Sequence, residues 1–153
     1  MLISNQGAES YIDVVTGVRF CVGGYFDGYP EVVIKKTRSG ITLDVRPGFA
    51  DPSRSHQRSF SDMEWDTLLD ALYCKLYLHE WKKRFDNPDI LDGIQWELEL
   101  QLTRRRKRTY SGSNDFPPLW AALTGLFQPF FREAEIQITE VDPTVFADSS
   151  PII

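Results

Sequence analysis

The most conspicuous chemical feature of this 153-residue sequence is a run of five cations: Arg104, Arg105, Arg106, Lys107 and Arg108. The formal net charge of the chain is −5, so the residues outside the run together carry −10. A concentrated basic patch can bind phosphate groups, because nucleic-acid affinity comes largely from the release of condensed counterions. The run falls at an expected hairpin turn of an acidic chain, and we therefore expect it to face solvent or a protein partner. Nucleic-acid binding remains an alternative, which requires that these arginines gather with other cations on one continuous face.

A second group of candidate residues consists of His79, Trp81 and Trp96. Together they could line a cleft between helix and sheet, which would suit a small-molecule-binding protein or a small enzyme. The competing interpretation is that the tryptophans belong to the core, because aromatic side chains bury large areas there, and that His79 is an ordinary polar residue. We favour the core for the aromatic side chains and keep the cleft as an alternative.

The sequence shows no recognisable metal or catalytic signature. The two cysteines and two histidines lack the CxxC or HxxxH spacing of a zinc site or a thiol–imidazole pair: Cys21, Cys74, His56 and His79. Residues 111–114 precede a helix but lack the lysine and the spacing of a phosphate-binding loop, and residues 86–97 lack the ligand positions of a calcium loop. We therefore expect no catalytic residue, no metal and no cofactor, and an enzyme is the less favoured class.

These candidate residues are positioned by one unit, residues 92–131. Apolar residues at 96, 98, 100 and 102 alternate with polar ones, which predicts a strand of an antiparallel sheet with one buried face. A basic turn and a returning strand around residues 109–111 follow. Asn114 or Asp115 is expected to cap a helix over residues 116–128, with Pro117 and Pro118 in its first turn and Pro129 ending or kinking it.

The remaining elements are assigned from the same signals. Residues 11–15 and 18–22 are expected to be strands, or one strand with a bulge, and residues 31–36 and 41–46 form the clearest hairpin. Residues 47–60 are expected to be a surface loop. The capping box at residues 61–64 starts a helix, which we expect to end near Lys75.

Two later segments are harder to assign. Residues 76–83 are predicted to be a strand, with continuation of the preceding helix as the alternative, and residues 86–93 then form the connecting loop. Residues 134–141 are a candidate edge strand.

The motifs DGxxWxLxL (residues 92–100) and SGSNxFPPxW (residues 111–120) resemble a group of uncharacterised small bacterial proteins, among them proteins from mobile gene cassettes and accessory loci. The resemblance covers residues 64–131 and carries no assigned activity. It supports a strand at residues 76–83, and it implies an accessory role in a mobile genetic element, such as neutralising a partner protein.

Composition and pattern together predict one α+β domain over residues 1–153: an antiparallel sheet of about five to seven strands with two helices on one face, a two-layer sandwich. Residues 1–10 and 142–153 are expected to be loose tails. With no long apolar run and no export signal at its start, the chain is expected to be soluble and cytoplasmic, without membrane contact. The favoured function is a non-catalytic binding protein whose partner is another protein or a second copy of itself.

Overall fold

The computed structural model describes residues 10–24, 28–48, 55–86, 94–113, 115–117, 119–136 and 138. A helical turn at residues 10–12 precedes the first strand. The elements then follow in this order: β1 (Val15–Gly24), β2 (Glu31–Thr37), β3 (Gly40–Arg46), β4 (His56–Phe60), α2 (Asp62–Asp70), η2 (Ala71–Lys75), η3 (Leu78–Glu80), β5 (Arg84–Asp86), β6 (Ile94–Leu102), η4 (Thr103–Arg105), β7 (Lys107–Ser113) and α3 (Trp120–Glu133).

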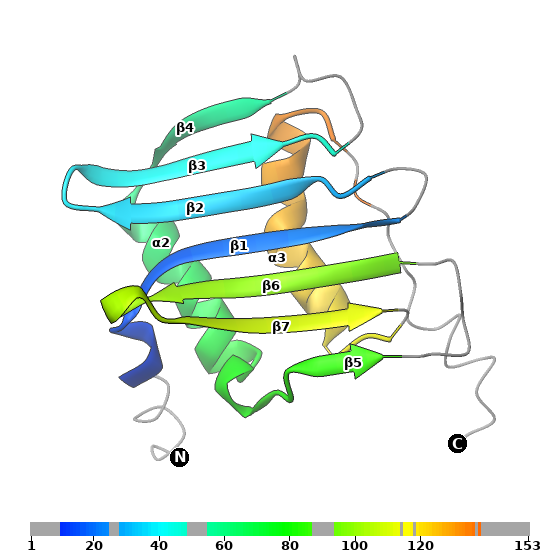
Figure 1. Ribbon diagram of the computed structural model, residues 1–153. Coiled ribbons are helices and arrows are strands. Elements are labelled where there is room, and N and C mark those ends of the chain that lie inside the picture. Colours follow the sequence, from blue (N-terminus) through cyan, green and yellow to red (C-terminus); the bar gives the residue numbers. More distant parts are fainter. Residues whose placement is uncertain are drawn as a thin grey trace.

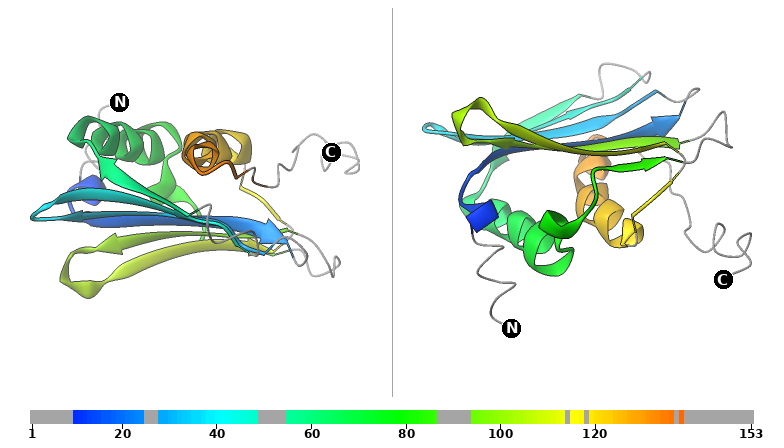
Figure 2. Two further views of the ribbon diagram at one scale, coloured as in Figure 1. Left: turned by 90° about the horizontal axis from the view of Figure 1, so that it is seen from above. Right: turned by 60° about the horizontal axis from the view of Figure 1, so that its bottom comes forward.

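The strands form one open seven-stranded sheet in the order β4-β3-β2-β1-β6-β7-β5, shown in Figure 1. All neighbouring strands are antiparallel except β5 and β7, which run parallel. Helices α2 and α3 lie on the same side of the sheet, as both views of Figure 2 show, and within the described residues the opposite face carries no helix. The prediction of an α+β fold with two helices on one face of an antiparallel sheet is confirmed.

The core lies between the sheet and the two helices. In β6, Trp96, Leu98 and Leu100 are buried, as their alternation with polar residues predicts. In β1, Phe20 stacks on Phe127 of α3, with the ring centroids 4.6 Å apart. The sheet therefore presents one apolar face to the helices and one polar face to solvent.

Helix α2 begins where the sequence indicates. The Ser61 hydroxyl accepts a hydrogen bond from the Glu64 amide, and the Glu64 carboxylate accepts one from the Ser61 amide, both at 3.0 Å. Arg58 of β4 also donates to Glu64 and to Glu133 near the end of α3. One guanidinium thus links the edge strand to both helices.

The prediction for residues 76–83 is wrong, as is the alternative of a continuing α-helix. The helix ends in a π turn at Lys75, and Tyr77 takes a left-handed conformation with φ 52° before the short 3₁₀ helix η3. Leu76 and Leu78 are buried while Tyr77 is exposed, so the alternation in the sequence reflects burial in a compact turn. The sheet edge beside β7 is occupied by β5 (Arg84–Asp86) instead.

Two further expectations, for the start of β1 and the start of β4, are corrected. Residues 11–12 belong to a helical turn, and the strand begins only at Val15, with an irregularity in its pairing between Val15 and Gly17. The surface loop expected at residues 47–60 ends before His56, because β4 pairs there with β3. The hairpin of β2 and β3 is confirmed, with Gly40 at φ 135° in its turn.

Helix α3 also differs from its prediction. It begins at Trp120 without a side-chain cap, while the Asp115 carboxylate accepts from the adjacent Phe116 amide. It continues through Pro129 to Glu133, with the exposed Gly125 one turn before the proline.

Residues 134–136 form a turn after α3 and not the start of an edge strand. Three other predictions fall largely or wholly outside the described residues. They are the rest of the expected edge strand (residues 137–141), the expected tails (residues 1–10 and 142–153) and the capping role of Asn114. In the described part of the chain, no helix is both long and apolar enough to cross a membrane.

Candidate functional site

The face of the sheet opposite the helices, which no helix covers in the described part of the chain, contains a groove that runs along the central strand, β1. The outward positions of β1 along the groove are Gly17, Arg19 and Cys21, so two of the three have a small side chain or none, whereas the backbone of Gly28 covers the outward side of Gly23. The flanking strands β2 and β6 carry long polar side chains at the same level. The result is a trough along β1, which we call the β1 groove, crossed in its middle by Arg19.

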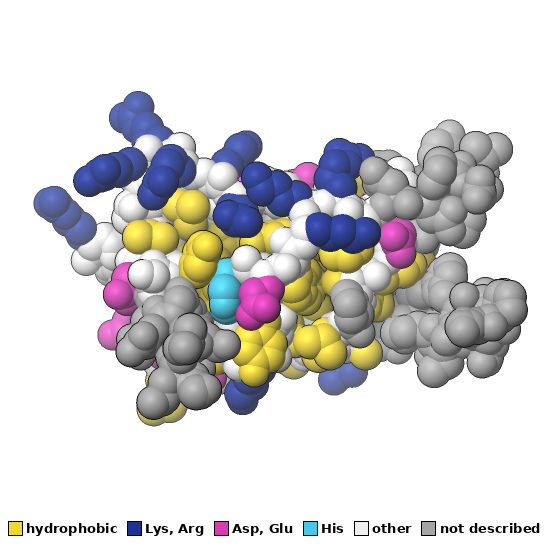
Figure 3. All heavy atoms as spheres, turned by 90° about the horizontal axis from the view of Figure 1, so that it is seen from below, with side chains coloured by type: hydrophobic (Ala, Val, Ile, Leu, Met, Phe, Trp, Pro, Cys, Tyr) yellow, Lys and Arg dark blue, Asp and Glu magenta, His cyan; other side chains and the backbone are white. Residues whose placement is uncertain are grey.

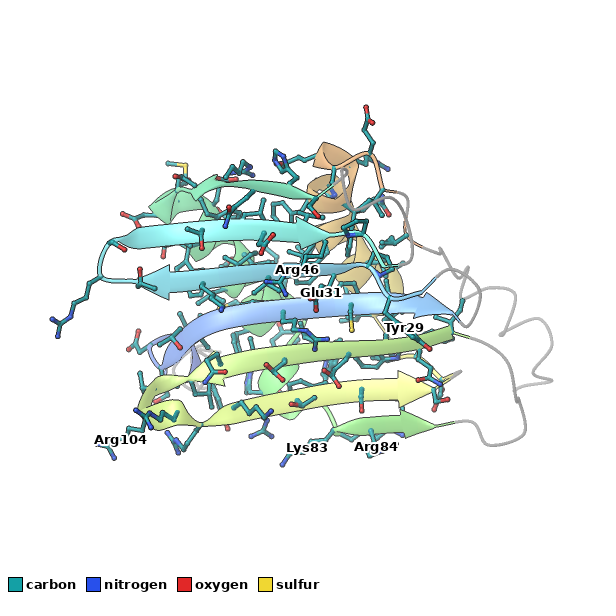
Figure 4. All side chains as sticks on the ribbon, turned by 45° about the horizontal axis from the view of Figure 1, so that its top comes forward. Tyr29, Glu31, Arg46, Lys83, Arg84 and Arg104 are labelled. Atoms are coloured by element: carbon teal, nitrogen blue, oxygen red, sulfur yellow. The ribbon has the colours of Figure 1, made fainter. Side chains whose placement is uncertain are left out.

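Two hollows make up the β1 groove, one on each side of Arg19. The first, of about 490 Å³, lies over Gly17 and is lined by Val33 and Lys35 of β2 and by Glu99 and Gln101 of β6. The second, of about 390 Å³, lies over Cys21 and reaches Tyr29 and Ser111. In Figure 4 the labelled side chains of Glu31, Arg46 and Tyr29 lie on this open face.

A charge network holds Arg19 across the groove. Its guanidinium donates to Glu31 of β2 at 2.6 Å and to Glu97 of β6, and Glu31 also accepts from Arg46 at 3.1 Å. Partial burial acts to lower the pKa of Arg19, but the hydrogen bonds to the two carboxylates more than offset it, and the pKa lies above its usual value. The groove is therefore divided by a fixed, fully charged cation.

Cys21 forms part of the groove floor and has little nucleophilic character. Burial raises the pKa of its thiol to about 11, although Arg19 nearby acts to lower it. The thiol is therefore protonated at neutral pH, and the thiolate is the reactive form. His56 pairs with Glu133 of α3 on the opposite, helix-bearing face of the sheet. Cys21 and His56 therefore lie on different faces and cannot act as a thiol–imidazole pair.

The structure packs the three predicted cleft residues into or against the core. Trp96 is 2% exposed and donates to the Asp115 carbonyl oxygen at 2.9 Å. Trp81 is half-buried and donates to the Leu76 carbonyl oxygen at 2.8 Å. His79 stacks on Tyr73, with the ring centroids 6.0 Å apart. Trp81 and Trp96 both contact the Phe85 ring, whereas the His79 ring stacks on Tyr11 and Tyr73.

The basic run 104–108 does not stand alone. Arg104 and Arg105 lie in the β6–β7 turn with left-handed backbones, and the run continues into β7. The pairing of β5 with β7 brings a second basic segment, residues 82–84, to the same edge of the sheet. Figure 4 shows Lys83, Arg84 and Arg104 along this edge, and Figure 3 shows Lys and Arg side chains gathered in a band beside a hydrophobic area. We call residues 82–84 and 104–108 together the basic edge.

The described residues contain no group of three or more His, Cys, Asp or Glu side chains that could hold a metal ion. No protein-family model matches the sequence, and a comparison with curated proteins finds no match. The site is therefore interpreted from its own geometry.

Sequence reasoning missed the β1 groove and three of the eight residues of the basic edge. The signal for the groove was the pair of small outward residues at positions 17 and 21 of β1, on either side of Arg19. This was hidden because the strand was expected to begin earlier. The Lys82-Lys83-Arg84 run was visible in the sequence, but its place beside β7 depends on a parallel pairing that the sequence pattern does not reveal.

Proposed function

We propose that the protein is a non-catalytic binding protein that holds an extended segment of a partner protein in the β1 groove. The observation that carries this proposal is the trough of two hollows along the central strand of an uncovered sheet face. The strands that flank β1, β2 and β6, lie two strand spacings or about 10 Å apart, which leaves room between them for one extended polypeptide.

The lining of the β1 groove supports a protein segment over a small molecule. Both hollows offer hydrogen-bonding side chains, with Lys35 and Gln101 around the first hollow and Glu97 and Ser111 around the second. The half-buried Val33 adds an apolar contact. Extended segments are recognised by polar groups along the backbone and by hollows for alternate side chains, and this surface offers both.

Chemistry is a weaker candidate for the same surface. A nucleophile or general base should be poised near neutral pH, but the pKa of the Cys21 thiol is raised to about 11. An accessory role in a mobile genetic element, in which the partner is neutralised, rests on the sequence resemblance alone and is part of the proposal.

Site-specific photo-crosslinking tests the proposal. A benzophenone amino acid at Val33, which lines the first hollow, is compared with the same group at Asp66, an exposed position on α2. We expect the Val33 probe to capture one discrete protein in cells, and the Asp66 probe not to. The charge reversal Lys35→Glu, at the rim of the same hollow, should reduce that product several-fold.

Four other results would contradict the proposal. Equal capture from both positions, or no product from Val33, would exclude the groove as the contact surface. A crosslink only to a second copy of the chain would indicate self-association through the open face. A small molecule that co-purifies in native mass spectrometry, and that is lost on Val33→Trp, would favour a small-molecule-binding protein.

A further inference from the structure

The basic edge is assembled from two segments that are about 20 residues apart in the sequence. The Ser111 amide donates to the Lys83 carbonyl oxygen at 2.9 Å, and Arg84 lies opposite Ser111 in the parallel pairing. Residues 82–84 therefore lie alongside the strand that the run 104–108 enters. The arginines thus gather with other cations along one edge of the sheet, the kind of clustering on which nucleic-acid binding depends.

The charge density of the basic edge is high for this chain. It contains eight of the 17 Lys and Arg residues, and seven of the eight are exposed. Lys107 pairs with Glu99 at 3.7 Å. Like charges held this close repel one another, and a polyanion that neutralises them gains affinity from the counterions it releases.

Aromatic side chains lie directly beside these cations. Trp81 precedes Lys82, is half-buried, and packs edge-on against Tyr110 of β7 with the ring centroids 6.2 Å apart. Tyr77 is 44% exposed and begins the turn that leads into Trp81. Unpaired bases stack on aromatic rings of this kind, whereas the bases of a duplex are already stacked on each other.

We propose that the basic edge binds single-stranded nucleic acid, with the phosphates along the cations and the bases on the aromatic side chains of residues 77–81. A duplex is a poorer fit, since α2 exposes Asp62, Asp66 and Asp70 and α3 exposes a single cation, Arg132, so neither helix suits the phosphate-lined major groove. The basic edge meets the β1 groove at Arg84, which also lines the second hollow. Arg104, Arg105, Arg106 and Tyr77 line neither hollow, so variants at these residues test this proposal alone.

The test is fluorescence anisotropy with labelled oligo(U) and oligo(dT) strands of about 20 nucleotides and with a duplex of the same length. We expect saturable binding of the single strands at micromolar protein and about 50 mM salt. The logarithm of the affinity should fall linearly with the logarithm of salt, with a slope of about −0.7 for each phosphate contact.

Two triple variants with the same change in charge locate the site. Replacing Arg104, Arg105 and Arg106 by Gln should weaken binding at least tenfold and reduce the salt slope by about 2. Replacing three exposed cations away from the edge by Gln should change affinity less than twofold: Lys36 and Arg38 of the β2–β3 hairpin and Arg132 of α3. Tyr77→Asn keeps a residue that tolerates the left-handed backbone and should weaken single-strand binding about fivefold or more.

Several outcomes would overturn the proposal. These are no anisotropy change at low salt, equal loss in the two triple variants, and a duplex that binds as tightly as the single strands. Displacement of the oligonucleotide by polyglutamate of equal charge at equal concentration would show that the edge accepts any polyanion and would point to an acidic protein. A preference between oligo(U) and oligo(dT) would assign the strand as RNA or DNA.

Discussion

Gly112 of β7 is a position where a single added carbon should have a large effect. Gly112 lies opposite Trp96 in the β6–β7 pairing and opposite Phe85 in the β5–β7 pairing. A Cβ there would overlap the Trp96 indole nitrogen, lie 2.7 Å from its Cε2 and 2.5 Å from the Asp115 carbonyl oxygen. Gly112→Ala must therefore displace Trp96 and break its hydrogen bond to Asp115.

The cost of Gly112→Ala has two parts. Forcing a side chain out of a packed core costs about 1–3 kcal/mol, and the lost hydrogen bond adds about 1 kcal/mol. The free energy of unfolding should thus fall by about 2–4 kcal/mol, which for a chain of this size lowers the melting temperature by about 5–15 °C.

Gly125→Ala is the matched control, because the same atom is added in helix α3 where nothing lies within 4 Å. Removing a glycine from an exposed helix position stabilises by about 0.5–1 kcal/mol. Urea unfolding and calorimetry of both variants measure the two effects. A Gly112→Ala protein within 0.5 kcal/mol of the wild type would refute the packing derived for Trp96.

Three further predictions concern the charged groups and the thiol. The hydrogen bond from Arg58 lowers the pKa of Glu64 to about 2. Arg58 therefore contributes stability that is present above about pH 4.5 and is lost as the pH falls toward 2. In Arg58→Gln the melting temperature should be lower at pH 7 than in the wild type and should fall less steeply as the pH is lowered. Cys21 should react with iodoacetamide at pH 7.5 about 100-fold more slowly in the folded than in the unfolded protein, since burial raises its pKa to about 11; equal rates would exclude this. Arg19→Met should lower the free energy of unfolding by about 1–3 kcal/mol, because two carboxylates lose their cation. Arg46→Met removes a more exposed cation and should lower it by less than about 1 kcal/mol. Equal losses in the two variants would contradict the central role of Arg19.

The sequence was informative wherever local pattern and tertiary environment agree. Alternation at residues 96–100 predicted the buried face of β6, and the reciprocal hydrogen bonds of Ser61 and Glu64 start α2 as expected. It failed where a long-range contact decides the local conformation. The alternation at residues 76–78 is real, but Tyr77 adopts a left-handed backbone and the leucines are buried by a turn, which no period-of-two pattern distinguishes from a strand.

Less of the candidate site could be predicted than of the fold. The run 104–108 was found because its five members are consecutive in the sequence. Its partner, residues 82–84, is placed by a three-residue parallel pairing, too short to leave a pattern. The β1 groove depends on which residues of β1 face outward, and an error in where the strand begins obscures that assignment.

The position of β1 at the centre of the sheet has a consequence for how the chain reaches its native state. Strands β1 to β4 follow one another and can pair in sequence, but the other edge of β1 must wait for β6, since Val18 pairs with Leu100. Closing so long a loop is slow, and until it closes an apolar strand has an open edge. During synthesis the N-terminal half therefore depends on the late arrival of β6, and this interval is when the newly made chain is most prone to aggregate.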